Sequence, residues 1–240
     1  MKILSIDTSS NICGVSILEN TELLCILDNN TGRTHSENLM PMIDEVFKKT
    51  DLNIKDIDLI VCDIGPGSFT GIRIGIATVK AFKDSLNIPC IGISSLEALA
   101  YNVTNDSNLI CSILDAKNDN CYFALYEKKD NIIETLIEPQ AEDIQSAIAI
   151  LKSYIEDNYN TFNITFVGDG SKVFQSQIKE TFNESEIIDK NLDNLNSYNL
   201  GICGLKNYLN GQVNKEILPL YLKKPQAQRL LEEKMKGINN

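Results

Sequence analysis

The chain has 240 residues, of which 43% are hydrophobic and 23% are charged. This composition is ordinary for a soluble globular protein and excludes wholesale disorder, and the length suffices for one large domain or two small ones. With 22 Lys and Arg against 33 Asp and Glu, the formal net charge is −11. Tight binding of nucleic acid by the isolated chain is therefore disfavoured, because contacts with phosphates require a basic surface.

Two features of the sequence indicate the compartment. The opening MKILSID enters a strand pattern at once, without the segments of a secretory signal, and no stretch approaches the roughly 20 apolar residues of a membrane span. The seven cysteines are scattered and form no CxxC, which favours buried, reduced thiols over a metal or disulfide framework. We therefore expect a cytoplasmic protein that makes no membrane contact.

The amino-terminal half alternates short apolar runs with helical periodicity. Hairpin-length polar turns separate the first three runs, which is typical of an antiparallel meander. The pattern predicts strands at 2–6, 12–18, 22–27, 59–62 and 90–93, and helices at 36–49, 69–86 and 95–101.

The same order of elements returns after a polar break at 104–107. The second set predicts strands at 109–114, 120–126, 131–137 and 164–167, and helices at 140–157 and 171–181. A shift of 108 positions places Asp7 on Asp115, Cys13 on Cys121 and Glu19 on Glu127. A carboxylate at the same strand end in both sets indicates a duplicated supersecondary plan.

Two halves of mixed sheet with helices predict an α/β protein with the duplicated ribonuclease-H-like fold of the actin-like ATPases (the ASKHA fold). In that fold the two halves face a cleft. We expect an amino-terminal half at 1–105, a carboxyl-terminal half at 106–195 with a loop over 182–196, and a closing unit at 196–240 with a helix near 197–210. Lys and Arg gather only near its end, at Lys215, Lys223, Lys224, Arg229, Lys234 and Lys236.

Three polar or glycine-rich turns follow predicted strands. Each could bind an anion or nucleotide through backbone N–H groups, and each could equally be an ordinary tight turn that permits close packing. The turn after 59–62 lacks the GK[ST] of a P-loop. Both interpretations stay open for the candidate residues, which are Asp7, Thr8, Ser9, Gly67, Ser68, Gly168 and Gly170.

His35 is the only histidine, and Leu39 stands four residues beyond it. A metal site normally needs two or three imidazole or carboxylate ligands at defined spacing, and no such helical pair exists here. A catalytic triad would also lack its GxSxG nucleophile turn. We expect no metal site and no catalytic residue, with His35 making a polar contact at a helix start.

The helices at 36–49 and 69–86 are unusually apolar. The first has an apolar arc broader than a one-sided helix needs, with a capping box from Thr34 to Glu37 and a kink expected at Pro41. The second is apolar almost all round. Such helices are covered on two sides, either by their own chain or by another subunit, and the pattern alone leaves both options open.

Several segments resemble, in order and spacing, the TsaB (YeaZ) family. They are ILSIDTSSNICGVSIL, RTHSENLMPMIDEVF, GPGSFTGIRIG and SSLEALA, with weaker agreement at ILDAKNDNCYFALY, VGDGS and YLKKPQA. The chain departs from the family pattern at Cys62-Asp63, just before the glycine-rich turn.

The resemblance implies a cytoplasmic, non-catalytic role in forming threonylcarbamoyladenosine on tRNA, beside the anticodon. In that family the protein pairs with TsaD, which holds the metal and transfers the group, and the ATPase TsaE completes the assembly. It implies no cofactor for this chain itself, with ATP or ADP possible only within the complex, tRNA reached only through the complex, and a homodimer when the chain is alone.

The resemblance also places the contact with TsaD on the two apolar helices. The implied contact residues are Leu39, Met40, Ile43, Val46, Phe47, Ile72, Arg73, Ile76, Val79 and Lys80. An actin-like ATPase or small-molecule kinase, using Asp7, Ser9 and the glycine turns, is the alternative function.

Overall fold

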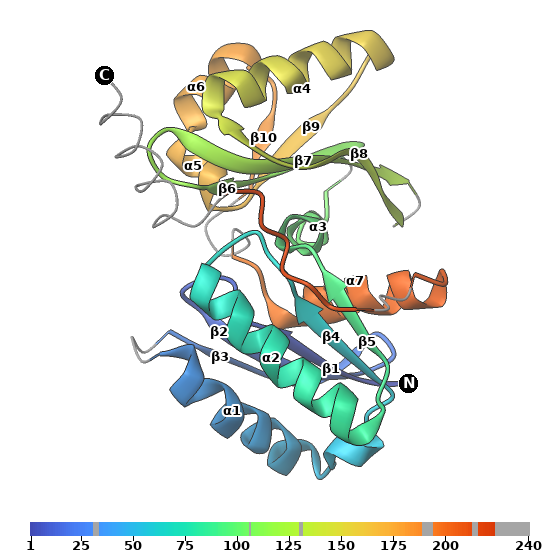
Figure 1. Cartoon of the computed structure of the whole chain (residues 1–240). Coiled ribbons are helices and arrows are strands. Elements are labelled where there is room, and N and C mark those ends of the chain that lie inside the picture. The colour runs from blue at the N-terminus through green and yellow to red at the C-terminus, as the bar shows by residue number, and fades with distance from the viewer. Residues whose placement is uncertain (31–33, 106, 130–131, 189–193, 213–215, 224–240) are drawn as a thin grey trace, which may run out of the picture.

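The computed structural model describes residues 1–240 except 31–33, 106, 130–131, 189–193, 213–215 and 224–240. These residues form two mixed β-sheets with helices (Figure 1). The first half contains β1 (Lys2–Asp7), β2 (Cys13–Glu19), β3 (Glu22–Asn29), α1 (His35–Thr50), the 3₁₀ turn η1 (Ile54–Asp56), β4 (Leu59–Asp63), α2 (Phe69–Leu86), β5 (Cys90–Ile93) and α3 (Ser95–Ala100). The remainder contains β6 (Leu109–Asp115), β7 (Asn120–Lys129), β8 (Ile132–Asp143), α4 (Ile144–Asn158), β9 (Ile164–Val167), α5 (Asp169–Val173), α6 (Gln175–Thr181), β10 (Glu186–Ile187) and α7 (Ser197–Leu209).

The two sheets share one topology. The strand order is β3-β2-β1-β4-β5 in the first sheet and β8-β7-β6-β9-β10 in the second. In each, the first strand pairs antiparallel with the second and parallel with the fourth. Asp7 and Asp115 both end the central strand of their sheet. The predicted α/β fold of two duplicated halves is confirmed.

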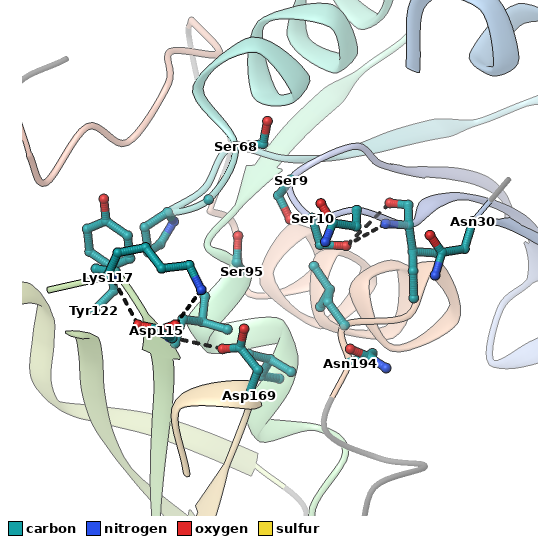
Figure 2. Close-up of a pocket in the computed structure, with 18 residues that line it drawn as sticks. Ser9, Ser10, Asn30, Ser68, Ser95, Asp115, Lys117, Tyr122, Asp169 and Asn194 are labelled. Atoms are coloured by element: carbon teal, nitrogen blue, oxygen red, sulfur yellow. Dashed lines mark hydrogen bonds and ion pairs between the residues drawn. The ribbon is translucent and has the colours of Figure 1, made fainter. Parts of the chain in front are cut away.

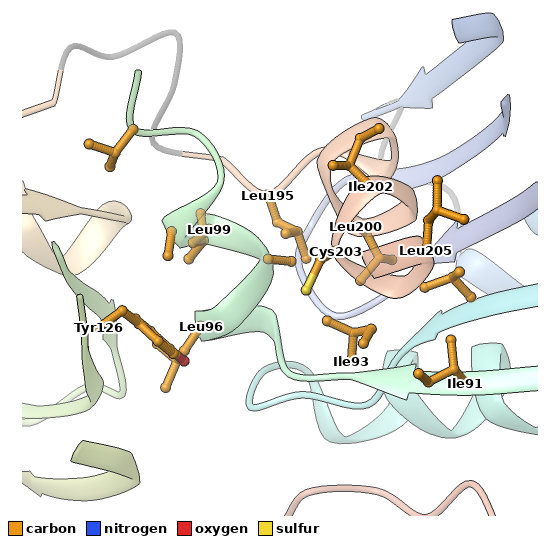
Figure 3. Close-up of a cluster of buried hydrophobic side chains, with 14 of the residues drawn as sticks. Ile91, Ile93, Leu96, Leu99, Tyr126, Leu195, Leu200, Ile202, Cys203 and Leu205 are labelled. Atoms are coloured by element: carbon orange, nitrogen blue, oxygen red, sulfur yellow. The ribbon is translucent and has the colours of Figure 1, made fainter. Parts of the chain in front are cut away.

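Two helices, α3 and α7, form the core between the halves, and each packs on the sheet of the other half. α3 comes from the first half and packs on β6 and β7 of the second sheet, while α7 follows the second half and packs on β1 and β2 of the first sheet. Figure 3 shows the resulting apolar cluster, in which Leu96 and Leu99 of α3 and Leu200 of α7 are fully buried. This exchange of helices connects the halves, and the boundaries at 105 and 195 stay a prediction.

The predicted helix at 140–157 begins too early. β8 continues to Asp143, because its ladder with β7 still pairs Tyr122 with Ala141 and Asn120 with Asp143. The helix starts at Ile144, and the Asp143 side chain accepts a hydrogen bond from the Ser146 N–H at 3.0 Å as its N-cap. Cross-strand pairing thus overrides the helix propensity of this segment.

Two further elements differ from the prediction. The helix expected at 171–181 is two short helices, α5 and α6, which meet at Phe174. The loop expected at 182–196 contains the short strand β10, paired in parallel with β9. Residues 189–193 of that loop, and the basic tail apart from Lys223, lie outside the described residues.

Helix α1 runs as one helix through Pro41, and its start agrees with the predicted capping box, because Thr34 N donates to Glu37 Oε2 at 3.3 Å. All seven cysteines are free, and all but Cys25 are buried. No helix within the described part of the chain has the length and apolar character needed to span a membrane.

Candidate functional site

A polar cavity of about 530 Å³ lies between the two halves, at the carboxyl ends of both central strands. Figure 2 shows hydroxyl and amide side chains on the first-half wall and a group of charged side chains opposite. Its polar lining consists of Ser9, Ser10, Asn11, Asn30, Ser68, Ser95, Asp115, Lys117, Tyr122, Asp169 and Asn194.

The first-half wall is built on the turn after β1. Asp7 Oδ1 accepts hydrogen bonds from both Ser9 N and Ser9 Oγ, each at 2.8 Å. This closes a turn in which the carboxylate binds the backbone two residues ahead. Asp7 and Thr8 are only 1% exposed and lie behind the wall, whereas Ser9 and Ser10 line the cavity.

A second buried carboxylate, Asp63 at the end of β4, lies beside Asp7. Its Oδ1 accepts hydrogen bonds from Gly65 N at 2.6 Å and from Ser95 Oγ at 2.7 Å. Burial, and next the charge of Asp63, raise the pKa of Asp7 well above its ordinary value. Burial also raises the pKa of Asp63. The pair therefore keeps a proton to higher pH than an ordinary aspartate.

The glycine-rich turn packs directly on the Asp7–Ser9 backbone. A Cβ at Gly67 would lie 2.3 Å from Ser9 O, and one at Gly71 would lie 1.9 Å from Thr8 O. Ser68 N already donates to Ser9 O at 2.6 Å, and the Ser68 side chain caps α2 by accepting from Gly71 N. The close-packing interpretation is confirmed for these glycines, while anion binding at this turn stays a prediction.

The second-half wall repeats the aspartate turn with a cation. Asp115 Oδ1 accepts from Lys117 N at 2.8 Å, and its Oδ2 pairs with Lys117 Nζ at 2.5 Å. Asp169 Oδ1 accepts a hydrogen bond from Asp115 N at 3.0 Å. Lys117, Asn118 and Asp119 all have positive φ, a conformation that costs energy outside glycine. This wall thus places one cation, Lys117, and two carboxylates, Asp115 and Asp169, at the cavity.

The glycines at the start of α5 again permit a close approach. Gly168 has φ of +104°, and a Cβ there would lie 2.3 Å from Ile113 O. At Gly170 the nearest atom to a Cβ would be Leu114 C, at 2.9 Å. Both glycines are buried behind the cavity wall.

The structure divides the seven predicted anion-site residues into two groups. Ser9, Gly67 and Ser68 line the cavity. The other four support the wall from behind; they are Asp7, Thr8, Gly168 and Gly170. Sequence reasoning missed Asp63 and Lys117 as site residues. The 108-residue shift could have found Asp115 and its neighbour Lys117, since it already aligned Asp115 with Asp7.

His35 makes the predicted contact at a helix start, because its Nε2 lies 2.7 Å from Ser10 O. Among the residues that the structure describes, no three His, Cys, Asp or Glu side chains gather in a group that could hold a metal ion.

The structure changes the interpretation of the ten implied partner-contact residues. α1 and α2 lie side by side over one face of the first sheet (Figure 1). Six of the ten are buried in the chain's own core against that sheet. They are Leu39, Ile43, Val46, Ile72, Ile76 and Val79, each at most 5% exposed.

The other four reach the surface. Met40 is 51% exposed, Arg73 is exposed, and Phe47 and Lys80 are partly exposed. The outward side of α2 mixes polar and small residues, namely Thr70, Arg73, Ala77, Ala81 and Asp84. A helix pattern alone does not indicate how much of an apolar helix its own chain covers.

Comparisons with solved structures agree with this architecture. YeaZ from Pseudomonas aeruginosa superposes with a TM-score of 0.76 at 20% identity, over 92% of this chain and 99% of that one. Component A of the (R)-2-hydroxyglutaryl-CoA dehydratase of Acidaminococcus fermentans gives 0.51 at 10% identity, over 88% and 98%. At these identities the likeness shows the fold alone.

Comparisons of sequence show the family. The family model described as "TsaD: tRNA N6-adenosine threonylcarbamoyltransferase" matches residues 26–230. The tRNA threonylcarbamoyladenosine biosynthesis protein TsaB of Bacillus subtilis is 34% identical over 63% of this chain, a match that covers 66% of that protein, just under two thirds. TsaB of Buchnera aphidicola (subsp. Schizaphis graminum) is 31% identical over 79% of this chain and 88% of that protein. The chain therefore belongs to the family that this model describes and, within it, to the TsaB (YeaZ) family.

Proposed function

We propose that this chain is a subunit of the system that forms threonylcarbamoyladenosine on tRNA, and that it binds and activates TsaD without being a catalyst itself. The observation that supports this best is the match to a TsaB relative over 88% of that protein's length. The family model that matches the chain is described as the transferase TsaD. The chain's single histidine is too few for the HxxxH metal motif of TsaD, so the transfer step belongs to the partner.

The outward side of α1 and α2 is the proposed TsaD contact. It combines the exposed Met40 and the partly exposed Phe47 with small residues, Ala77 and Ala81, that allow a second pair of helices to approach closely. Arg73 and Lys80 lie at its margin, where they pair with Tyr221 and Glu216 of the same chain. Exposed apolar side chains surrounded by polar residues are typical of an interface. Without TsaD, the same surface would pair with itself in a two-fold dimer.

Transfer RNA and nucleotide would enter only through the complex. The net charge of −11 gives the isolated chain little attraction for phosphates. TsaE would join the assembly through TsaD and this chain together, and ATP or ADP would bind in that assembly rather than to this chain alone. The chain would act in the cytoplasm, where the tRNA substrate is.

An actin-like ATPase or small-molecule kinase is the second candidate. The cavity between the halves favours it, since 530 Å³ lies within the usual range for small-molecule sites. Two features of the cavity oppose the kinase. Asp7 is buried with a raised pKa, which makes it a poor magnesium ligand, and Lys117 is already paired with Asp115.

Reconstitution of the modification separates the two candidates. Purified TsaD and TsaE from the same organism, with tRNA and the threonylcarbamoyl donor, should form the modified nucleoside only when this chain is added. The chain alone should neither modify tRNA nor hydrolyse ATP, measured by nucleoside mass spectrometry and phosphate release. ATP turnover by the chain alone that Asp115→Asn abolishes would favour the kinase. Full modification without the chain would contradict the proposed function.

A further inference from the structure

The segment Glu216–Lys223, here called the strap, crosses from the first half of the molecule to the second. It contains no helix or strand. In Figure 1 it is the red segment that passes α2 and β5 and ends beside β6. Because it follows the second half in sequence yet lies over the first, each of its contacts joins parts of the chain that are far apart.

The strap is anchored in the core of the first half. Ile217 is 1% exposed and belongs to the apolar cluster under α1 and α2. Leu220 N donates a hydrogen bond to Ile64 O at 2.8 Å, directly before the glycine-rich turn. Glu216 Oε1 lies 3.6 Å from Lys80 Nζ of α2 and forms an ion pair with it. The strap is therefore attached along most of its length, rather than resting loosely on the surface.

The Tyr221 side chain contacts both Phe69 and Arg73 of α2. Its ring stacks on Phe69 with centroids 4.4 Å apart and an angle of 21° between the planes. Arg73 Nε donates to the Tyr221 hydroxyl at 2.7 Å, and the guanidinium lies 3.9 Å from the centre of the Phe69 ring. Stacked aromatic rings with a cation against one face attract one another beyond simple burial. These contacts fix the strap to the first turns of α2.

Two residues later, the strap reaches the other half. Lys223 Nζ lies 5.6 Å from the centre of the Tyr122 ring on β7. Tyr122 lines the cavity between the halves, and so do Gly67 and Ser68, which lie between the strap's anchor points at Ile64 and Phe69. The strap therefore contacts the first half at the start of α2, directly after the cavity-lining Ser68, and the second half at the cavity-lining Tyr122.

We propose that the strap is a clasp that holds the two halves closed around the cavity. Tyr221 is its anchor on the first half, and Lys223 is its contact with the second. The core of α3 and α7 joins the halves in any case, so loss of the Lys223 contact would loosen only the cavity walls, and loss of the Tyr221 contacts would also loosen the strap at the first turns of α2. This inference concerns the chain by itself and does not depend on a contact with TsaD.

Hydrogen exchange of the backbone amides tests the clasp, using the full chain and the Tyr221→Ala variant. Two amides report on the cavity walls, since Ser68 N donates to Ser9 O and Asp115 N donates to Asp169. Both should exchange about tenfold faster in the variant, together with Leu220 N. Phe162→Ala is the matched control, because Phe162 is 42% exposed and Tyr221 41%. The control should leave all three amides unchanged.

Lys223→Met provides a second, milder test that does not disturb the stack. It should speed exchange at the Ser68 and Asp115 amides but leave the Leu220 amide protected, because the strap stays anchored on the first half. The same pattern would support the clasp if Tyr221→Ala proved unable to fold. Unchanged exchange at both wall amides in Lys223→Met would overturn the proposal, since the strap would then be a passive tail.

Discussion

The two halves end their central strand with an aspartate in the same turn but in different surroundings. Asp7 and Asp115 each accept a hydrogen bond at 2.8 Å from the backbone N–H two residues ahead. Asp7 is 1% exposed and shares its site with a second carboxyl group, Asp63. Asp115 faces the cavity and pairs with Lys117. The duplicated backbone thus holds one buried carboxyl pair that keeps a proton and one ion pair at the cavity, in which Lys117 is exposed and Asp115 is largely buried.

The groups beside each strand end explain the difference. Continued by one residue, the register of β1 with β4 places Asp63 beside Asp7. In the second half the ladder of β6 with β9 ends at the pair Ser112–Val167, three residues before Asp115, and Asp169 at the start of α5 accepts a hydrogen bond from Asp115 N. Both strand ends therefore have a second carboxyl group nearby, but only in the second half does a lysine, Lys117, pair with the strand-end aspartate. The neighbours, and not the fold, decide the charge state at each strand end.

Substitution of the glycines that let each helix approach its aspartate turn should cause the largest loss of stability. In Gly71→Ala, the new Cβ would lie 1.9 Å from a backbone oxygen, Thr8 O. The gain in helix propensity does not offset this clash, and we expect a loss of about 3 kcal/mol or more in the free energy of unfolding. Gly170→Ala, at 2.9 Å, should lose about 1–2 kcal/mol. Urea unfolding measures both, and a neutral Gly71→Ala would show that the turn is looser than described.

Asp7→Asn, which removes the proton shared with Asp63, should have a smaller effect on the free energy of unfolding. Because the pKa of Asp7 is raised, the folded protein keeps a proton at pH values where the unfolded chain has released it. The free energy of unfolding should therefore fall as pH rises above about 4, by at most about 1.4 kcal/mol per pH unit for this proton. Asp7→Asn carries no such proton, so its free energy of unfolding should fall less over pH 4–7.

Asp115→Asn is the matched variant for that measurement. It removes the carboxylate of the second half and should leave the slope of the parent protein in place. Urea unfolding at several pH values gives the three slopes. Equal slopes for Asp7→Asn and the parent would mean that the buried pair releases its proton as readily as an exposed aspartate does.

Much of the fold could be predicted from the sequence because its signals are local. Apolar runs, polar turns and the recurrence at 108 residues predict both sheets, and the order of strands follows from the duplication. The error at 140–143 has a non-local cause, since pairing with β7 keeps a helix-forming segment extended. The break between α5 and α6 at Phe174 likewise has no local signal of the kind that glycine or proline gives.

The site was less predictable because it depends on which side chains meet. The turn residues Ser9 and Ser68 were found from composition, but the Asp7–Asp63 pair requires the register of two strands. The contact of Arg73 with Tyr221 joins positions 148 residues apart, and no periodicity indicates it. The helical pattern also could not separate the buried Ile76 from the exposed Met40.

We propose that the first half, and not the second, carries the surface for TsaD. Met40 on α1 and Val173 on α5 provide a direct test, because they are 51% and 56% exposed and lie on helices of different halves. A charge at either position should leave the fold intact, and circular dichroism with thermal unfolding checks this for each variant.

The measurement is the Kd for TsaD by analytical ultracentrifugation. We predict that Met40→Glu raises Kd by about 30-fold or more, because it leaves a charge unpaired in an apolar contact, while Val173→Glu changes Kd by less than about twofold. Unchanged binding by folded Met40→Glu, or a loss of binding confined to Val173→Glu, would contradict the account and place the partner surface elsewhere.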